Sequence, residues 1–144
     1  MEKYDLNDCT FGINIRFTTE DRKRNIKLVI EHLLKYLDTN IIIAEEDKTS
    51  IFPELIPTIQ GWDENKCKYI FIESSNEFMG KTKSFNKIFY EVNTPIYVLQ
   101  DADVICSPEM YLEAANQVRK QQAEFCYSFD GNCFNVPEDI IPLF

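Results

Sequence analysis

The sequence predicts an α/β domain built on an open, mostly parallel, Rossmann-like sheet with helices on both faces. Short apolar runs alternate along the chain with segments in which apolar side chains recur at helical spacing. One run, Ile41 to Ala44, is apolar at every position, as expected of a parallel strand that is covered on both faces. The 144 residues, of which 44% are hydrophobic, suffice for the core of one domain, and neither a repeat nor an interdomain linker occurs.

The first half of the chain predicts two strands that flank one helix. Residues 11–17 alternate apolar and polar side chains, a pattern typical of a half-buried strand. Two threonines followed by Glu and Asp begin a predicted helix over residues 18–37. The sequence Asp-Thr-Asn at 38–40 is expected to end this helix before the apolar strand at 41–44. Residues 48–67 contain prolines and a glycine and predict an irregular excursion with a short helical turn.

The second half of the chain repeats this alternation. Residues 69–72 are predicted to be a strand, and residues 84–92 a helix with one apolar side. A proline precedes the next predicted strand, at 96–99. The sequence Ser-Pro-Glu is typical of a helix start, with Ser as the cap and Pro at the first helical position, and predicts a helix over 107–121. A last strand is predicted at 124–129.

Charged side chains stand at the ends of three predicted strands. Arg16 lies at the end of the first strand, Glu45 and Glu46 follow the second, and Asp101 and Asp103 follow the fourth. In open parallel sheets, ligands bind in the crevice outside the carboxyl ends of the strands. We therefore expect these side chains, which are distant in the sequence, to converge at one edge of the sheet.

The sharpest pattern is the Asp-x-Asp pair, Asp101 and Asp103. Two carboxylates at this spacing, just past a buried strand, can face one ligand where the chain turns. Mg²⁺ and Mn²⁺ prefer oxygen from carboxylate, water and phosphate, so these residues and a diphosphate would complete an octahedral shell. An ion there would neutralise charge on a departing diphosphate. The alternative is a solvated loop, but the apolar strand before the pair and the Ser-Pro start after it favour the metal site.

A basic segment surrounds the start of the helix predicted at residues 84–92. It begins at Gly80 and places Lys81, Lys83 and Lys87 close to Asn86. Helix N-terminal amides and ammonium groups suit phosphate, so this segment is a candidate phosphate site. The alternative for each lysine is a solvated, basic helix end.

Arg16 and the two glutamates each have a structural alternative. Arg16 is suited to a base or a phosphate, or else to a surface salt bridge with Glu20 or Asp21. Glu45 and Glu46 are placed to accept hydrogen bonds from a uracil ring or a ribose, or else belong to an exposed acidic loop. Their position at a strand end favours the binding site.

Charge and motif content exclude several classes of function. The formal net charge is −9, and a surface so acidic repels nucleic acid and anionic lipid. With four glycines, the chain contains neither a Walker nor a Rossmann phosphate loop. The five cysteines are odd in number and show no C-x-x-C spacing, which disfavours zinc and disulfides and is typical of reduced cytoplasmic thiols.

The expected location is the cytoplasm. The start of the chain is polar and acidic, unlike a signal peptide, and no apolar run approaches the roughly 18 residues of a membrane span. We therefore expect no transmembrane segment, and peripheral association with the inner membrane face stays open.

Five sequence blocks carry a family resemblance. They are residues 13–16, 41–46, 80–86, 98–103 and 125–131. Together they resemble the N-terminal, nucleotide-binding half of a GT-A-fold glycosyltransferase, and within that fold the family 2-like and galactosyltransferase-like bacterial enzymes. The resemblance covers nearly the whole chain, and the order and spacing of the blocks are much more specific than any single block.

The resemblance implies a sugar-nucleotide donor, expected to be a UDP-sugar, bound through Mn²⁺ or Mg²⁺. The glycosyl group would be transferred to the hydroxyl of a carbohydrate or other acceptor. In this family the Asp-x-Asp pair binds metal and donor, which implies Asp103 as a metal ligand and Asp101 as a contact to the ribose or the metal.

The resemblance also implies residues around the nucleoside. An acid at the end of the second strand contacts the nucleoside in this family, which implies either Glu45 or Glu46. The segment from Lys83 to Asn86 resembles the lining of the nucleotide pocket. Arg16 matches the polar residue that follows the first strand.

Enzymes of this kind continue beyond the Asp-x-Asp half, and the continuation supplies the catalytic base and most of the acceptor site. This sequence stops after an apolar stretch at 140–144, where that half would begin. We therefore expect residues 1–144 to be a single, truncated donor-binding domain without its acceptor half, and we assign no catalytic base. The apolar end predicts packing against the missing half or against another subunit of a homo-oligomer.

Three other functions fit the sequence less well. A catalytically silent nucleotide-binding or interaction domain fits the short length, but the intact Asp-x-Asp pair argues against complete decay. A sugar nucleotidyltransferase uses a Gly-rich loop after the first strand, where this chain has Arg-Phe-Thr-Thr at 16–19. A haloacid-dehalogenase-type phosphatase has its Asp-x-Asp after the first strand and follows it with Thr, neither of which holds here.

Overall fold

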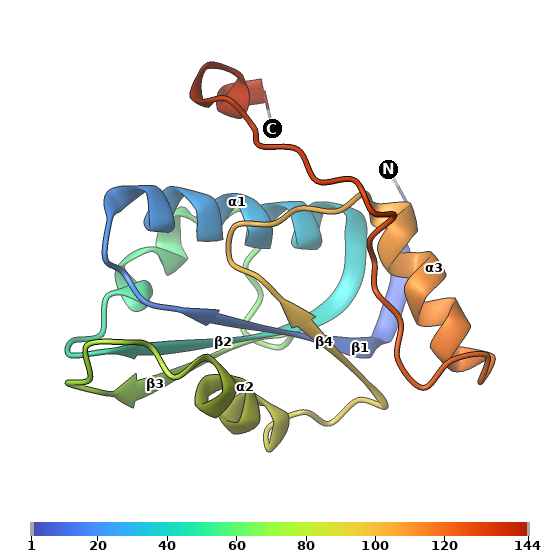
Figure 1. The fold of residues 1–144 in the computed structure, drawn as a ribbon, viewed down its shortest axis with the longest axis horizontal. Helices are drawn as coiled ribbons and strands as arrows, with labels where there is room; N and C mark the ends of the chain where they lie inside the picture. The colour runs from blue at the N-terminus through green and yellow to red at the C-terminus, as the bar shows by residue number, and fades with distance from the viewer. Residues whose placement is uncertain (1, 144) are drawn as a thin grey trace.

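The fold is centred on a four-stranded, all-parallel sheet with the strand order β3-β2-β1-β4 (Figure 1). The computed structural model describes residues 2–143, with side chains described as far as residue 141. The strands are β1 (Tyr4–Ile15), β2 (Leu37–Asp47), β3 (Cys67–Glu73) and β4 (Ile96–Gln100). This is the open parallel sheet that the sequence predicts.

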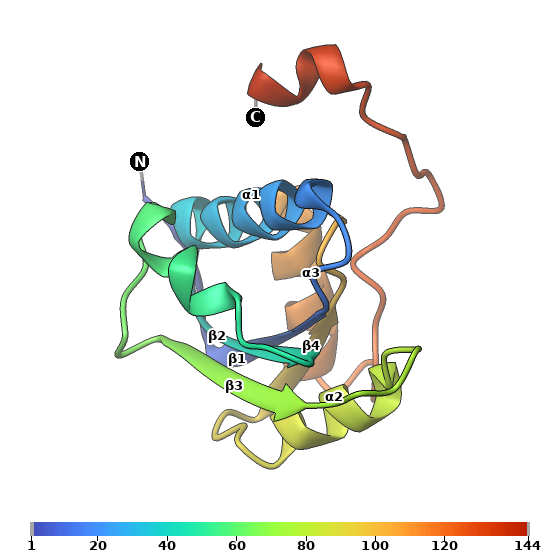
Figure 2. The same cartoon turned by 90° about the vertical axis from the view of Figure 1, so that its left-hand side faces the viewer.

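Helices cover the sheet on both faces, as Figures 1 and 2 show. On one face lie α1 (Glu20–Tyr36) and α3 (Pro108–Arg119), and on the other lies α2 (Lys81–Phe89). The excursion between β2 and β3 holds two short 3-10 turns, Phe52–Glu54 and Ile56–Thr58, in the region where a helical turn was predicted. No helix in the described part of the chain combines the length and the apolar character that crossing a bilayer requires.

Strand β2 shows why a continuous apolar run is needed at the centre of the sheet. Successive side chains of a strand point to opposite faces. Ile41 and Ile43 belong to the core beneath α1, whereas Ile42 and Ala44 pack with Ile88 of α2. The run is therefore apolar at every position because both faces are buried, as predicted.

The first two strands are longer than predicted. β1 begins at Tyr4, well before the predicted start, and β2 begins at Leu37, so residues 38–40 form part of a strand instead of a stop after the helix. Tyr4 and Leu37 are partners in the parallel register. Pairing between β1 and β2 provides hydrogen bonds for the backbone N–H and C=O groups of these added residues, although their polar side chains do not by themselves indicate a strand. It also places Glu45 and Glu46 inside β2 and not after it.

Helix α3 begins at Pro108, as the Ser-Pro signal predicts. Ser107 is the N-cap residue, as predicted, with extended backbone angles, although its side chain makes no capping hydrogen bond. The helix start is supported instead by the proline and by Glu109 in the first turn.

The strand predicted at residues 124–129 does not form. A strand needs a hydrogen-bonded neighbour, and among the described residues this segment pairs with none of the four strands. Phe125 and Tyr127 are 75% and 78% exposed, so these aromatic side chains face no core. Beyond α3 the chain runs away from the sheet and ends in a 3-10 turn at Glu138–Leu143 (Figure 1).

Gly12 of β1 packs closely against Tyr97 of β4 and Ile88 of α2, and Gly12→Ala is expected to destabilise the fold. A Cβ atom there would lie 2.5 Å from Cε2 of Tyr97 and 2.9 Å from Cγ2 of Ile88. Overpacking of a buried site costs about 1–3 kcal/mol, and urea unfolding should show a loss of that size. Because Tyr97 causes most of the clash, the loss should be smaller in a Tyr97→Leu background. An equal loss in both backgrounds would contradict this cause.

Candidate functional site

Arg16 directly follows β1 and is buried, with 8% of its surface exposed. Its Nε atom donates to the carbonyl oxygen of Glu46 over 2.7 Å, and its Nη1 atom donates to the carbonyl oxygen of Asn76 over 2.9 Å. Its Nη2 atom lies 3.4 Å from Oε1 of Glu46 and forms an ion pair. The guanidinium therefore ties the end of β2 to the loop before α2, in place of the surface salt bridge to Glu20 or Asp21.

Glu46 is fully buried in β2 on the face that α2 covers. Its Oε2 atom accepts hydrogen bonds from the backbone N–H of Gly80 over 2.9 Å and from the hydroxyl of Ser84 over 3.0 Å. Burial acts to raise the pKa of Glu46, but hydrogen bonds from Ser84, Ser74 and Gly80 and the charge of Arg16 hold this pKa below its ordinary value. The ionised carboxylate binds the first turn of α2, which explains why the helix begins before the predicted residue 84.

Glu45 points to the opposite face of the sheet. It is fully buried, and its carboxylate accepts hydrogen bonds from the backbone N–H of Ile51 over 2.8 Å and of Phe52 over 3.1 Å. The hydroxyl of Tyr69 is a third donor to this carboxylate. Glu45 therefore holds the excursion that follows β2 and lies apart from Glu46 and Arg16.

Asp101 and Asp103 lie in the turn after β4, here called the Asp-x-Asp turn. The carboxylate of Asp101 forms an ion pair with Nζ of Lys81, the first residue of α2. The preceding residue, Gly80, is bound to Glu46. The start of α2 thus joins the end of β2 to the Asp-x-Asp turn, and these groups share one edge of the sheet, here called the strand-end edge.

The Asp-x-Asp turn offers donors that suit a hard divalent ion. The side chain of Asp101 is 49% exposed despite its ion pair, and Asp103 is exposed. Carboxylate oxygen is a preferred ligand of Mg²⁺ and Mn²⁺. Within residues 2–143, no three His, Cys, Asp or Glu side chains gather into a metal-binding group.

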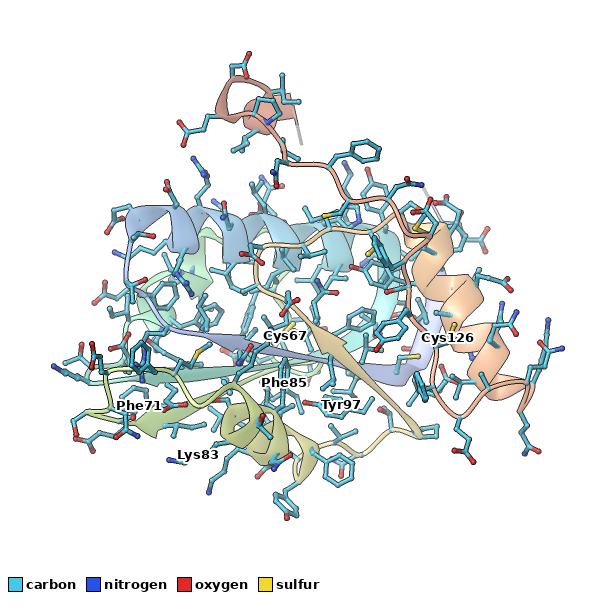
Figure 3. All side chains as sticks on the ribbon, viewed as in Figure 1. Cys67, Phe71, Lys83, Phe85, Tyr97 and Cys126 are labelled. Atoms are coloured by element: carbon cyan, nitrogen blue, oxygen red, sulfur yellow. The ribbon has the colours of Figure 1, made fainter. Side chains whose placement is uncertain are left out.

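Lys83 and Asn86 lie on the solvent side of α2. The helix buries Ser84 and Ile88, while Lys83 points away from the sheet, as Figure 3 shows. Neither Lys83 nor Asn86 makes a side-chain hydrogen bond or ion pair with any residue that the structure describes. The lysine that reaches the Asp-x-Asp turn is the exposed Lys81, which lies seven residues before Ile88 and so on the same side of the helix as that residue. That spacing is the sequence signal that would have identified it.

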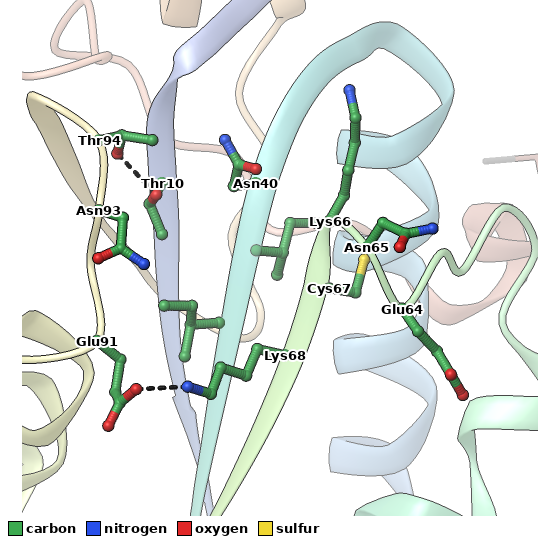
Figure 4. A pocket seen from close by; sticks show the side chains of 12 residues that line it. Thr10, Asn40, Glu64, Asn65, Lys66, Cys67, Lys68, Glu91, Asn93 and Thr94 are labelled. Carbon is green, nitrogen blue, oxygen red and sulfur yellow. Dashed lines mark hydrogen bonds and ion pairs between the residues drawn. The ribbon is translucent and has the colours of Figure 1, made fainter.

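The opposite edge of the sheet holds a cavity of about 250 Å³ (Figure 4). Polar side chains line it, among them Asn40, Lys66, Lys68 and Thr94. Lys68 forms an ion pair with Glu91 across this cavity. None of the site residues predicted from the sequence lines it, so the cavity is separate from the strand-end edge.

His32 connects α1 to the segment that follows the Asp-x-Asp turn. Its Nε2 atom lies 3.0 Å from the carbonyl oxygen of Cys106. Burial lowers the pKa of His32 below 6.5; the charge of Lys35 adds to this shift, and the bond to Cys106 opposes it. The unfolded chain therefore binds this proton more readily than the folded chain. The free energy of unfolding should fall as pH drops through 6.5 and level off below the folded-state pKa.

Urea unfolding of the wild type and of His32→Gln between about pH 7.5 and 5.5 tests this pH dependence. Gln keeps a donor that can reach the Cys106 carbonyl but does not titrate. The variant should therefore show a flatter dependence of unfolding free energy on pH in this window. Equal slopes for the two proteins would show that His32 does not contribute.

Comparison with known proteins gives a family. A family model described as Glycosyl transferase family 2 matches residues 18–138, a segment that includes Glu46, Lys81, Asp101 and Asp103. A search of the curated proteins gave no match. The matched segment contains strands β2, β3 and β4, the three α-helices and the Asp-x-Asp turn, whereas β1 and Arg16 precede it. With a match over this much of its length, the chain belongs to glycosyl transferase family 2.

Proposed function

We propose that this chain binds a nucleotide-diphospho-sugar, with UDP as the nucleotide, at the strand-end edge, as the donor of a glycosyl group to an acceptor hydroxyl. Membership of glycosyl transferase family 2 supports glycosyl transfer in general. The observation that carries the specific proposal is the ion pair between Asp101 and Lys81. It sets an acidic turn suited to a metal beside a basic helix start suited to phosphate, and a metal-bound diphosphate needs both.

Asp101 and Asp103 would hold a Mn²⁺ or Mg²⁺ ion together with oxygens of the diphosphate. When bound, such an ion neutralises negative charge on the diphosphate leaving group. Lys81 would supply a second positive charge, because its ammonium group already lies at Asp101 and its side chain is 55% exposed. A chain with a net charge of −9 needs such local cations to attract a diphosphate.

Of the two glutamates, we place Glu46 in the proposed site and leave Glu45 out. Glu46 binds Arg16 and the first turn of α2, so it fixes the wall against which a nucleoside would lie. The carboxylate of Glu45 is bonded on the other face of the sheet. Lys83 and Asn86 lie on the solvent side of α2, so they would contact only the part of the bound sugar nucleotide that is farthest from the sheet.

The proposal covers donor binding, and we assign no catalytic base. In glycosyl transfer the acceptor hydroxyl loses its proton and attacks the anomeric carbon, while the bond to the diphosphate breaks. The residues named above would act at the leaving-group side of this reaction. Lys81 would orient the phosphates, and Glu46 with Arg16 would keep the start of α2 fixed beside the Asp-x-Asp turn.

Calorimetric titration of UDP into the purified chain tests the proposal, first with Mn²⁺ and then with EDTA. Saturable binding that requires Mn²⁺ is expected, because the diphosphate completes the shell of the ion. GDP and ADP in the same buffer serve as controls for the preference for uracil. A folded chain that binds UDP equally in Mn²⁺ and in EDTA, or in neither, would refute a metal-dependent donor site.

A further inference from the structure

The Asp-x-Asp turn is held from beneath by a buried amide. Gln100, the last residue of β4, is 4% exposed. Its Nε2 atom donates to the carbonyl oxygen of Asp101 over 2.9 Å and to that of Val104 over 2.7 Å. One side chain therefore binds a carbonyl before Asp103 and a carbonyl after it, and so sets the shape of the turn between them.

Gln100 is itself oriented by Tyr111 of α3. The Tyr111 hydroxyl donates to Oε1 of Gln100 over 2.9 Å and accepts the N–H of Cys106 over 3.3 Å. The ring of Tyr111 is buried and packs edge-on against Phe11 of β1, with ring centroids 5.2 Å apart. Because the hydroxyl binds the amide oxygen, the NH₂ group of Gln100 must face the two carbonyls of the turn.

Packing alone does not require a polar residue at this place. Every second residue of β4 lies on the same face of the strand, which gives Ile96, Val98 and Gln100 a common face. The first two are apolar and pack against the main core. A buried amide is costly unless its donors and acceptor are bonded, and here all of them are. The amide therefore lies at the junction of β4 and the Asp-x-Asp turn, and both hydrogen bonds that its NH₂ group donates go to backbone carbonyls of the turn.

We propose that Gln100 and Tyr111 are positioning residues that set how Asp101 and Asp103 present their carboxylates to a divalent ion. The inference rests on the proposed function of the turn as a metal-dependent donor site. Neither side chain would touch the ion, and both act through the backbone of the turn. Outer-shell partners of this kind change metal affinity by about 10–100-fold when they are removed.

Two variants test the positioning role. Tyr111→Phe removes the hydroxyl but keeps the ring against Phe11, and Gln100→Leu removes the amide while keeping a similar volume. The first measurement is the Mn²⁺ concentration that gives half-maximal UDP binding in calorimetry, which should rise about tenfold in each variant. The second is hydrogen exchange of residues 100–106 in the metal-free chain, which should also accelerate about tenfold as the turn loosens.

Thr39→Val is the matched control. It removes a buried hydroxyl that donates to the carbonyl oxygen of Cys9 over 3.1 Å, at the other end of the sheet. This variant should leave the Mn²⁺ requirement and the exchange of residues 100–106 unchanged, although it loses a hydrogen bond of the same kind.

Each remaining outcome overturns the inference. Folded Gln100→Leu and Tyr111→Phe variants with the wild-type Mn²⁺ requirement would remove the positioning role and leave the proposed function standing. An equal change in Thr39→Val would assign the effect to general stability. A wild-type chain that binds no UDP with Mn²⁺ would remove the proposed function, and the positioning role with it.

Discussion

Asp103→Asn is expected to abolish Mn²⁺-dependent UDP binding at concentrations that saturate the wild type. The substitution keeps the size of the side chain but removes the charge that a hard divalent ion requires. Loss of even an outer-shell partner of a metal ligand costs about 10–100-fold, so loss of the ligand itself should exceed about 100-fold. That factor corresponds to at least about 2.7 kcal/mol of binding free energy. Calorimetric titration of UDP with Mn²⁺ measures it directly.

Glu64→Gln is the matched control for this measurement. Glu64 is an exposed acid that lines the cavity at the opposite edge of the sheet, and the substitution removes one negative charge, as Asp103→Asn does. If general repulsion of the diphosphate by the acidic surface governed binding, both variants would bind UDP more tightly. Wild-type affinity in Asp103→Asn would show that the Asp-x-Asp turn does not hold the metal.

The sequence predicted the strand-end edge better than it predicted the contacts there. Arg16 and Asp101 could be placed at one edge because parallel strands must end at the same side of a sheet. The ion pair of Asp101 with Lys81 could not be foreseen, because it depends on where α2 starts. That start is fixed by Glu46 binding the backbone of Gly80, a contact between residues far apart in the chain.

The period of a strand explains why Glu45 and Glu46 could not be told apart from the sequence. Neighbouring strand residues always face opposite sides, so one of the two had to face α2. The residues before them are apolar on both faces, which leaves no polar side to mark the direction. Only the pairing of β2 with its neighbours and the position of α2 decide the orientation.

The strand wrongly predicted at 124–129 has a different cause. Alternation of aromatic and polar side chains is a local property, whereas a strand also needs a neighbour with free backbone groups. In the described chain this segment has no such neighbour, and Phe125 and Tyr127 are exposed. The starts of α1 and α3 were predicted more reliably, because the acidic residues in their first turns and the proline of α3 act within the helix itself.

Glu46→Gln is expected to destabilise the chain by about 3 kcal/mol and to weaken Mn²⁺-dependent UDP binding at least about tenfold. Glu46 is fully buried, and the lost charge would leave the buried Arg16 uncompensated. The new amide group would also place a donor beside the N–H of Gly80 or the hydroxyl of Ser84. Urea unfolding measures the first effect and calorimetry the second, at a temperature where circular dichroism shows the variant folded.

Glu45→Gln separates stability from site geometry, because it alters the adjacent, equally buried carboxylate on the other face of β2. It should also destabilise the chain, by about 1–3 kcal/mol, since the N–H groups of Ile51 and Phe52 lose a charged acceptor. It should nevertheless bind UDP like the wild type, because Arg16, the start of α2 and the Asp-x-Asp turn stay in place. The opposite result, with UDP binding lost in Glu45→Gln and kept in Glu46→Gln, would show that the nucleoside binds on the face of the sheet that α1 covers.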